Sequence, residues 1–240
     1  KFLIARIGIN EFRDMVVEEL KEPWAEKSFD PTPLLFIEDE SIDAPGEPLG
    51  GYHTNGYLPD FQNWVETNVH EQKQDGYKAV TVKLPLGDIQ SEQFRQLADL
   101  SRKYAGGRAR ITHQQNLTLR WVPEKALYEV WEELNRIGLG DSGAHQITDV
   151  VGCPGTDSCK LGITSSMGVS RAVADTLRDM DIQDPLINQM HVKVSGCPNG
   201  CGQHHVADIG FHGAAMKAPG GQVPAYELFL GGSYEDGDSR

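Results

Sequence analysis

The sequence predicts an α+β protein, and three features of its 240 residues support this. Alternating, β-branched runs such as YKAVTVKLPL are typical of strands, whereas amphipathic runs such as SEQFRQLADLSRKYA are typical of helices. Glycine and proline separate these runs into short segments. From Asp149 onward the pattern changes to strands that end in turns rich in glycine, proline and cysteine. We therefore expect two folded domains, over residues 59–140 and 141–240, after an N-terminal segment.

The N-terminal segment, residues 1–58, combines one helix with a long connector. The run INEFRDMVVEELKEPW has apolar residues at helical spacing and predicts an amphipathic helix. From Phe29 to Tyr57 the chain is rich in proline, glycine and acidic residues, which predicts an irregular connector with at most one short strand. The chain starts at Lys1 without a methionine, so we expect it to be a piece of something longer.

Residues 59–140 have a clearer pattern. Asp60 is expected to cap a helix through QNWVETNVHEQK. The strand YKAVTVKLPL then leads to a helix that starts with Ser91 as N-cap and stops at Gly106-Gly107. Two short strands, RARITH and NLTLRWV, precede a helix with Pro123 in its first turn. Strand, helix, strand, strand, helix predicts an α+β sandwich of the ferredoxin-like kind, a ferredoxin-like half-domain.

Residues 141–240 predict an α/β domain. A short strand and a cysteine turn lead to a helix that starts near Lys160. The connector DIQDPLINQ precedes the strand HVKVSG and a second cysteine turn, and two further strand candidates follow, HVADIGFHGAAM and AYELFLGG.

The composition excludes several classes of function. The net charge is −13 and the pI is about 5.0, which argues against binding to nucleic acid or to an anionic membrane, because both need a basic face. No apolar run approaches the roughly 20 residues that cross a bilayer, and no secretory signal is visible. We expect a cytoplasmic protein with no nucleic-acid or membrane partner.

All four cysteines lie in the two turns, as Cys153 and Cys159 in a C-x5-C pattern and Cys197 and Cys201 in a C-x3-C pattern. Each pair follows a predicted strand. Two loops at strand ends can bring their thiolates together at one tetrahedral sulfur site.

Four interpretations of the cysteines are open. Disulfides are disfavoured because an intracellular chain is kept reduced. Zinc prefers about two residues between ligands, so the wider spacing suits it poorly. An iron–sulfur cubane accepts wider loops but needs backbone N–H groups near its sulfurs, which glycines permit. The spacing favours a cluster and leaves zinc, and four buried cysteines without metal, as alternatives.

The motifs GCPGTDSCKLG and SGCPNGCGQ together resemble the paired signature of the siroheme-dependent nitrite and sulfite reductases. Upstream, the run from Arg110 to Leu117 and the tripeptide Val122-Pro123-Glu124 are similar to the second ferredoxin-like half-repeat of that family. The resemblance covers about residues 60–232. It implies an oxidoreductase that reduces nitrite to ammonia, or sulfite to sulfide, with six electrons.

The resemblance also implies specific residues. It assigns Cys153, Cys159, Cys197 and Cys201 to a [4Fe-4S] cluster, and Cys201 would bridge the cluster to the siroheme iron and so be catalytic. The residues expected to bind siroheme are Arg110, Thr112, Gln115, Asn116, Thr156, Asn199 and Cys201.

Most of the siroheme positions also have a structural interpretation. Arg110 is equally consistent with a solvated strand residue, and Gln115-Asn116 with the turn of a β-hairpin. Asn199 suits a left-handed turn. Asp157 in the first cysteine turn could cap the following helix.

His204 and His205, which follow the last cysteine, are candidate ligands or proton donors. We expect them instead to be partly exposed polar residues.

The chain differs from the family in length. Family enzymes are usually more than twice as long, with two related halves, and most basic residues that bind the substrate anion lie in the first half. This chain resembles the second half and stops at Asp238-Ser239-Arg240, where the family continues, so its last domain is expected to be truncated.

The electron donor and the exact activity stay open. The family implies a donor such as ferredoxin or a flavoprotein, and a chain that uses ferredoxin should present a basic docking patch, which the charge of −13 does not suggest. Two alternatives from other classes are a non-catalytic iron–sulfur electron-transfer module and a zinc-stapled structural domain.

Overall fold

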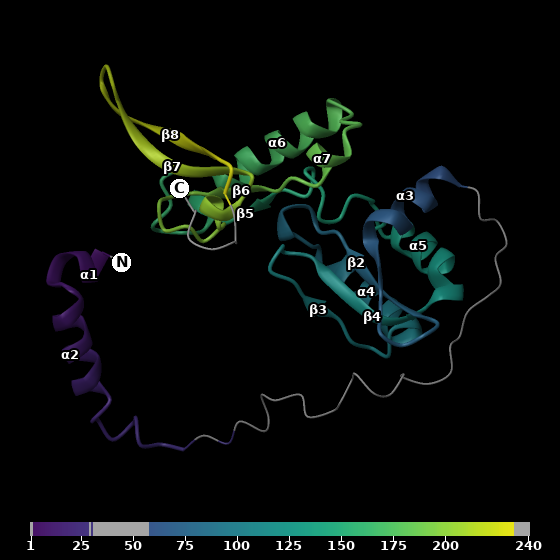
Figure 1. Ribbon diagram of the computed structural model, residues 1–240, viewed down its shortest axis with the longest axis horizontal. Coiled ribbons are helices and arrows are strands. Elements are labelled where there is room, and N and C mark those ends of the chain that lie inside the picture. The colour runs from purple at the N-terminus through teal and green to yellow at the C-terminus, as the bar shows by residue number, and fades with distance from the viewer. Residues whose placement is uncertain (1, 29, 31–57, 233–240) are drawn as a thin grey trace. The chain divides into compact units, whose positions relative to one another are not determined.

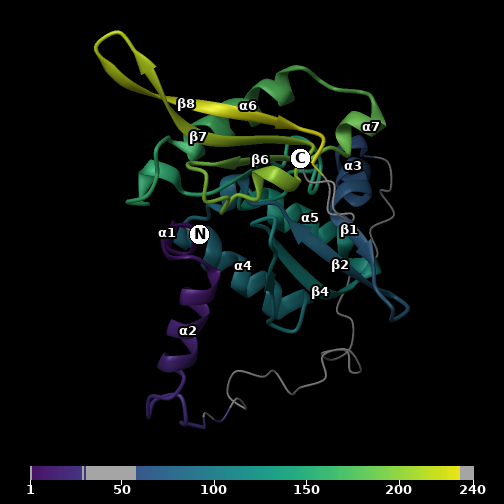
Figure 2. The same cartoon turned by 60° about the vertical axis from the view of Figure 1, so that its left-hand side comes forward.

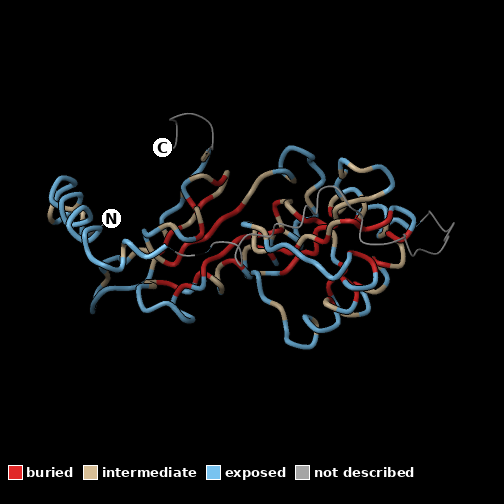
Figure 3. The backbone as a smooth tube through the Cα atoms, turned by 90° about the horizontal axis from the view of Figure 1, so that it is seen from below, coloured by how far each residue is buried: buried red, intermediate tan, exposed pale blue. Residues whose placement is uncertain are grey.

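The computed structural model describes residues 2–28, 30 and 58–232, and its chain divides into two compact units, residues 1–43 and 44–240. The described part of the first unit contains helices α1 (Phe2–Ile7) and α2 (Ile9–Glu19), which meet at Gly8. Helix α2 forms within the predicted amphipathic run. None of its residues is buried, and Figure 3 shows the N-terminal helices as mostly exposed. The connector predicted over residues 29–57 lies almost wholly outside the described residues.

The first sheet of the second unit has the strand order β1-β2-β4-β3, and every neighbouring pair is antiparallel. Its strands are β1 (Val69–Glu71), β2 (Tyr77–Val82), β3 (Arg110–Ile111) and β4 (Leu117–Pro123). Helices α3 (Pro59–Asn68) and α4 (Ser91–Tyr104) pack on the sheet, and α5 (Leu127–Arg136) packs against both helices (Figure 1). The predicted α+β half-domain is confirmed.

The interior of this half-domain is apolar. Trp64, Val80, Leu119 and Leu134 have no exposed surface and share one hydrophobic cluster. Leu117 and Leu119 of β4 point into this cluster, as the alternating sequence predicts, and Val122 joins it after a shift in the β2–β4 register.

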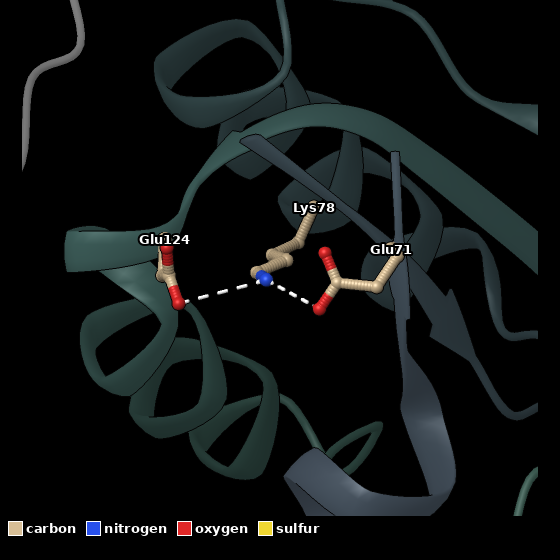
Figure 4. Close-up of polar contacts among 3 residues, drawn as sticks. All are labelled: Glu71, Lys78 and Glu124. Carbon is tan, nitrogen blue, oxygen red and sulfur yellow. Dashed lines mark hydrogen bonds and ion pairs between the residues drawn. The ribbon is translucent and has the colours of Figure 1, made fainter. Parts of the chain in front are cut away.

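At one edge of the half-domain, Lys78 on β2 lies between Glu71 of β1 and Glu124 of the 3₁₀ turn Glu124–Ala126, at 2.6 and 3.5 Å (Figure 4). The hydrogen bond with Glu71 is the main cause that raises the Lys78 pKa. The two ion pairs link β2 to β1 and to the turn that precedes α5.

The second sheet has the order β5-β6-β7-β8. Its strands are β5 (Val151–Gly152), β6 (Val192–Ser195), β7 (Ile209–Ala218) and β8 (Gly221–Leu230). The first three strands run parallel, and β8 returns antiparallel along the whole of β7. Helix α6 (Ser166–Asp179) packs on β5 and β6, and the β7–β8 hairpin extends past β6 (Figure 2).

The predicted helix starting near Lys160 begins later, at Ser166. Ser165 is its N-cap and accepts a hydrogen bond from the Gly168 N–H. Asp157 therefore does not cap α6, but its carboxylate accepts a hydrogen bond from the Ser165 hydroxyl at 3.1 Å. The predicted connector DIQDPLINQ contains the short helix α7 (Pro185–Asn188).

The predicted start and end of α3 are wrong. Leu58, not Asp60, is its N-cap, with Pro59 at the first helical position. The helix stops at Asn68, because the buried Asn68 amide donates to the carbonyls of Thr81 and Asp141 and the next residues join the sheet as β1.

Two more helix boundaries differ by one to four residues. Gln90, not Ser91, is the N-cap of α4, and it forms a capping box with Gln93. Pro123 ends β4 opposite Tyr77 instead of starting α5. The pairing of Pro123 with Tyr77 delays the start of α5, whereas the local capping box sets the start of α4.

Two separate hydrophobic cores lie on either side of residue 140, one in each sheet's domain. The predicted limits of 1–58, 59–140 and 141–240 stay predictions. Within the described residues, no helix is both long and apolar enough to span a membrane.

Candidate functional site

The two cysteine loops begin where neighbouring parallel strands end. Cys153 directly follows β5, and Gly196 and Cys197 directly follow β6. Because β5 and β6 are parallel partners, both loops leave the same edge of the sheet. The predicted meeting of the two loops therefore follows from the sheet topology.

Backbone hydrogen bonds join the two loops. The Cys153 N–H donates to the Val194 carbonyl at 3.0 Å, and the Gly196 N–H donates to the Cys153 sulfur at 3.1 Å. In return, the N–H groups of Ile163 and Thr164 donate to the Gly196 carbonyl at 2.8 and 3.1 Å. One thiol thus already accepts a backbone N–H from the other loop, which is the kind of bond that cluster thiolates need.

Glycine is required where the loops touch. A Cβ at Gly196 would lie 2.7 Å from the Cα of Gly155 and 2.9 Å from the Thr164 carbonyl. A Cβ at Gly162 would lie 2.7 Å from the backbone of Gly155. These distances leave no room for a side chain, so the glycines allow the backbone approach that the sequence predicts.

The four cysteines are free thiols that differ in exposure: Cys153 is buried, Cys197 is partly buried, and Cys159 and Cys201 are exposed. In the described ranges, no three His, Cys, Asp or Glu side chains are grouped closely enough to hold a single metal ion. Four thiols on two hydrogen-bonded loops, with an N–H group on one sulfur, fit the donor set of a [4Fe-4S] cluster, which spaces its thiolates more widely than one ion does.

The other predicted residues of these loops are exposed. Thr156 and Asn199 both have exposed side chains, and the Thr156 N–H donates to the Thr164 carbonyl at 3.1 Å. Each lies between two cysteines of its loop. Their side chains are open to a ligand.

The predicted siroheme residues of the half-domain lie around the turn between β3 and β4. Arg110 is exposed on β3 opposite Thr118. Thr112 closes the turn, because its hydroxyl accepts a hydrogen bond from the Asn116 N–H at 3.1 Å. Gln115 has a positive φ of 66°, as expected for a tight turn.

The side chains of Gln115 and Asn116 form hydrogen bonds with protein groups, most of them in the second domain. Gln115 donates to the Gly152 carbonyl at 2.8 Å and accepts from the Gly152 N–H at 3.2 Å. Asn116 is fully buried, accepts from the Leu84 N–H and donates to Asp149 at 2.7 Å. These bonds fix the half-domain to the strand that carries Cys153, and contact of these residues with siroheme stays a prediction.

His205 is exposed, as expected, but the same expectation for His204 is wrong, because only 5% of His204 is exposed. Its Nδ1 lies 2.9 Å from the Ser195 hydroxyl, which also accepts from the Gly202 N–H. The His204 ring packs against His212, at 4.9 Å between centroids. His204 thus braces the loop that carries Cys201.

Lys193, which no sequence motif marks, is almost completely buried in β6. Its ammonium donates to the Gln203 side chain at 2.7 Å, and Gln203 has a positive φ of 61°. A lysine between valines in a short strand is the only sequence signal for this contact.

Comparison with known proteins identifies the family. The family model of the nitrite/sulfite reductase ferredoxin-like half domain matches residues 70–137. The model of the nitrite and sulphite reductase 4Fe-4S domain matches residues 143–239. The chain belongs to the nitrite/sulfite reductase family. The family resemblance inferred from the cysteine motifs is confirmed.

Two curated members of the family illustrate the similarity. A ferredoxin–nitrite reductase of Synechococcus elongatus is 31% identical over 194 residues, which are 79% of this chain and 36% of that protein. A sulfite reductase [ferredoxin] of Mycobacterium tuberculosis is 27% identical over 236 residues, 97% of this chain and 38% of that protein. The chain therefore spans little more than a third of the length of either relative.

Solved structures support the same fold. The NirA protein of Mycobacterium tuberculosis superposes with a TM-score of 0.62 at 28% identity, over 97% of this chain and 38% of that chain. Dissimilatory sulfite reductase I superposes with a TM-score of 0.53 over 72% of this chain and 40% of that chain, and at 17% identity this similarity concerns the fold alone.

Proposed function

We propose that this chain is the cluster-binding part of a siroheme-dependent nitrite or sulfite reductase. The observation that carries the proposal is the hydrogen bond from the Gly196 N–H to the Cys153 sulfur, which joins the two cysteine loops at one sheet edge. Cys153, Cys159, Cys197 and Cys201 would hold the [4Fe-4S] cluster. When bound, the cluster would deliver single electrons to a siroheme that takes the anion.

The different exposure of the cysteines supports different roles for them. Cys153 is buried and hydrogen-bonded, so it anchors the site at the end of β5. Cys201 is exposed, as is Cys159, so its thiolate is accessible to a second metal atom, and the family resemblance assigns that role to Cys201. We therefore retain Cys201 as the proposed bridge to the siroheme iron.

The proposed siroheme residues divide into two groups. Arg110, Thr156 and Asn199 have exposed side chains that can offer a cation, a hydroxyl and an amide to the carboxylates of a macrocycle. Gln115 and Asn116 have their amides bound to other protein groups, so they act by holding Gly152 and Asp149 in place.

The substrate and the donor are proposed from the relatives. Two relatives are a ferredoxin–nitrite reductase and a sulfite reductase [ferredoxin], which supports nitrite or sulfite as substrate and ferredoxin as donor. A flavoprotein remains the alternative donor. The complete reaction needs the remaining part of an enzyme of the relatives' length, and we propose that the enzyme works in the cytoplasm.

Anaerobic reconstitution of the chain with iron and sulfide tests the proposal. We expect a brown protein with iron and sulfide in equal amounts and a broad thiolate-to-iron charge-transfer band. Cys201→Ser should reduce the iron content, whereas His205→Ser, a change at an exposed neighbour, should not. A colourless protein that retains zinc would contradict the proposal.

A further inference from the structure

Tyr226 on β8 lies next to the cysteine loops although it is distant from them in sequence. Its partner in the sheet is Gly213 on β7. A Cβ at Gly213 would collide with the Thr164 side chain and the Gly196 carbonyl, which belong to the two loops. Directly opposed residues of an antiparallel pair project from the same face, so the Tyr226 side chain projects from the face that the loops cover.

The Tyr226 hydroxyl is buried and lacks a hydrogen-bond partner among the described residues. A buried polar group without a partner is unfavourable, and such a group often marks a site where another ligand belongs. Thr164 is close enough to lower the Tyr226 pKa, but the two hydroxyls do not meet in hydrogen-bond geometry, and the Thr164 hydroxyl donates to the Gly196 carbonyl at 3.3 Å. The Tyr226 ring is fixed by an edge contact with Phe211, at 6.4 Å between centroids.

The hydroxyl stays protonated at neutral pH. Burial is the main cause that raises the Tyr226 pKa above its ordinary value of 10; the Thr164 side chain lowers it in part, and Cys153 and Asp157 raise it by smaller effects. Tyr226 is therefore a neutral hydrogen-bond donor on the sheet face that the two cysteine loops cover.

We propose that the Tyr226 hydroxyl donates a hydrogen bond to a sulfur atom of the bound [4Fe-4S] cluster, on the Cys153 side, and raises its reduction potential. This inference rests on the proposed function. Cluster sulfurs gain negative charge on reduction, so a hydrogen bond to sulfur stabilises the reduced form more than the oxidised form. The Gly196 N–H supplies a backbone donor to Cys153, and Tyr226 adds a side-chain donor from a different strand.

Tyr226→Phe removes the hydroxyl and keeps the ring. The matched control is Tyr104→Phe in the half-domain, where a buried tyrosine loses a real hydrogen bond to Glu133. Each full-length variant is reconstituted with iron and sulfide, and an anaerobic redox titration followed by electron paramagnetic resonance gives the midpoint potential.

We expect Tyr226→Phe to bind iron as the wild type does and to have a more negative midpoint. The reduction equilibrium should change several-fold and up to about tenfold, which is 59 mV for one electron. Resonance Raman spectra of the wild type in D₂O should show shifted iron–sulfur modes, and this shift should be smaller in Tyr226→Phe, in which the Gly196 N–H is the donor that remains on the Cys153 sulfur. Shifted terminal modes would identify a cysteine sulfur as the acceptor, and shifted bridging modes would identify a sulfide.

The two proposals can fail separately. If the wild type and Tyr226→Phe carry the same cluster at the same potential, the inference about Tyr226 is overturned and the proposed function stands. If Tyr104→Phe changes the potential as much as Tyr226→Phe does, the effect is a general loss of stability and the inference is also overturned. If the wild type binds no iron–sulfur cluster, both proposals are wrong.

Discussion

The side-chain amide of Gln115 is hydrogen-bonded at both ends to the backbone of Gly152, at 2.8 and 3.2 Å. Gly152 is the last residue of β5 and directly precedes Cys153. The turn of one domain therefore fixes the strand end from which the first cysteine loop of the next domain starts. In this family member, the half-domain supports the proposed cluster site through these hydrogen bonds.

Replacing Gln115 tests this contact. Gln115→Ala leaves both polar groups of Gly152 without their partner, so we expect a loss of about 1–3 kcal/mol in the free energy of unfolding. Iron retention after reconstitution should fall as well, because the Cys153 loop loses its support. Urea unfolding and iron analysis measure the two effects. Gln114→Ala, at the neighbouring turn position, is the control, and an equal effect of both variants would contradict a specific role of Gln115.

Asn116→Asp should be destabilising in a pH-dependent way. In the wild type, Asp149 accepts hydrogen bonds from the Asn116 amide and from the His145 N–H. The substitution replaces the first of these donors with a second carboxylate that faces Asp149. Two buried carboxylates repel each other until one is protonated. Relative to wild type, the variant should therefore lose less stability near about pH 5 than near about pH 8. An effect that does not depend on pH would argue against this arrangement.

Gly196→Ala tests the contact between the loops. The added methyl group would meet Gly155 at 2.7 Å, and neither backbone can yield without breaking loop hydrogen bonds. Overpacking of this kind costs about 1–3 kcal/mol, and we expect lower thermal stability and poor cluster binding. Gly168→Ala, in helix α6, is the control because its methyl group would meet no atom of the other cysteine loop and would come closest to the N-cap hydroxyl of Ser165, at 3.0 Å. Normal cluster binding by Gly196→Ala would show that the two loops can move apart and still bind the cluster.

The lowered pKa of His145 predicts how the stability of the fold depends on pH. Burial is the main cause that lowers the His145 pKa below the ordinary 6.5. Asp149 raises this pKa in part, and three nearby histidines lower it further: His70, His191 and His113. The unfolded chain therefore binds a proton at His145 more readily than the folded chain, so stability falls as the pH drops below 6.5. His145→Asn, chosen because asparagine tolerates the positive φ of 63°, should reduce this slope. Unfolding free energies measured above and below pH 6.5 test this, and an unchanged slope would contradict it.

The sequence predicts much of this structure because its local signals agree with the fold. The β-branched strands and the amphipathic α4 appear where periodicity places them, and the cysteine loops meet because both follow parallel strands. Helix ends differ where pairing with distant residues decides them, as at Asn68.

The parts of the site that the sequence does not predict depend on long-range contacts. Gln115 meets Gly152 across 37 residues, and Tyr226 reaches the cysteine loops only through its pairing with Gly213. His204 becomes buried because the β7–β8 hairpin brings His212 and Phe229 against it. Neither spacing nor composition encodes such contacts.

The central claim is that the two loops hold one [4Fe-4S] cluster with all four cysteines. Mössbauer spectra of the chain reconstituted with ⁵⁷Fe, together with the four single Cys→Ser variants, test it most directly. We predict one cubane spectrum for the wild type and a loss or alteration of this spectrum in every variant, at Cys153, Cys159, Cys197 and Cys201. A wild-type spectrum that persists unchanged in any of these variants would contradict the claim.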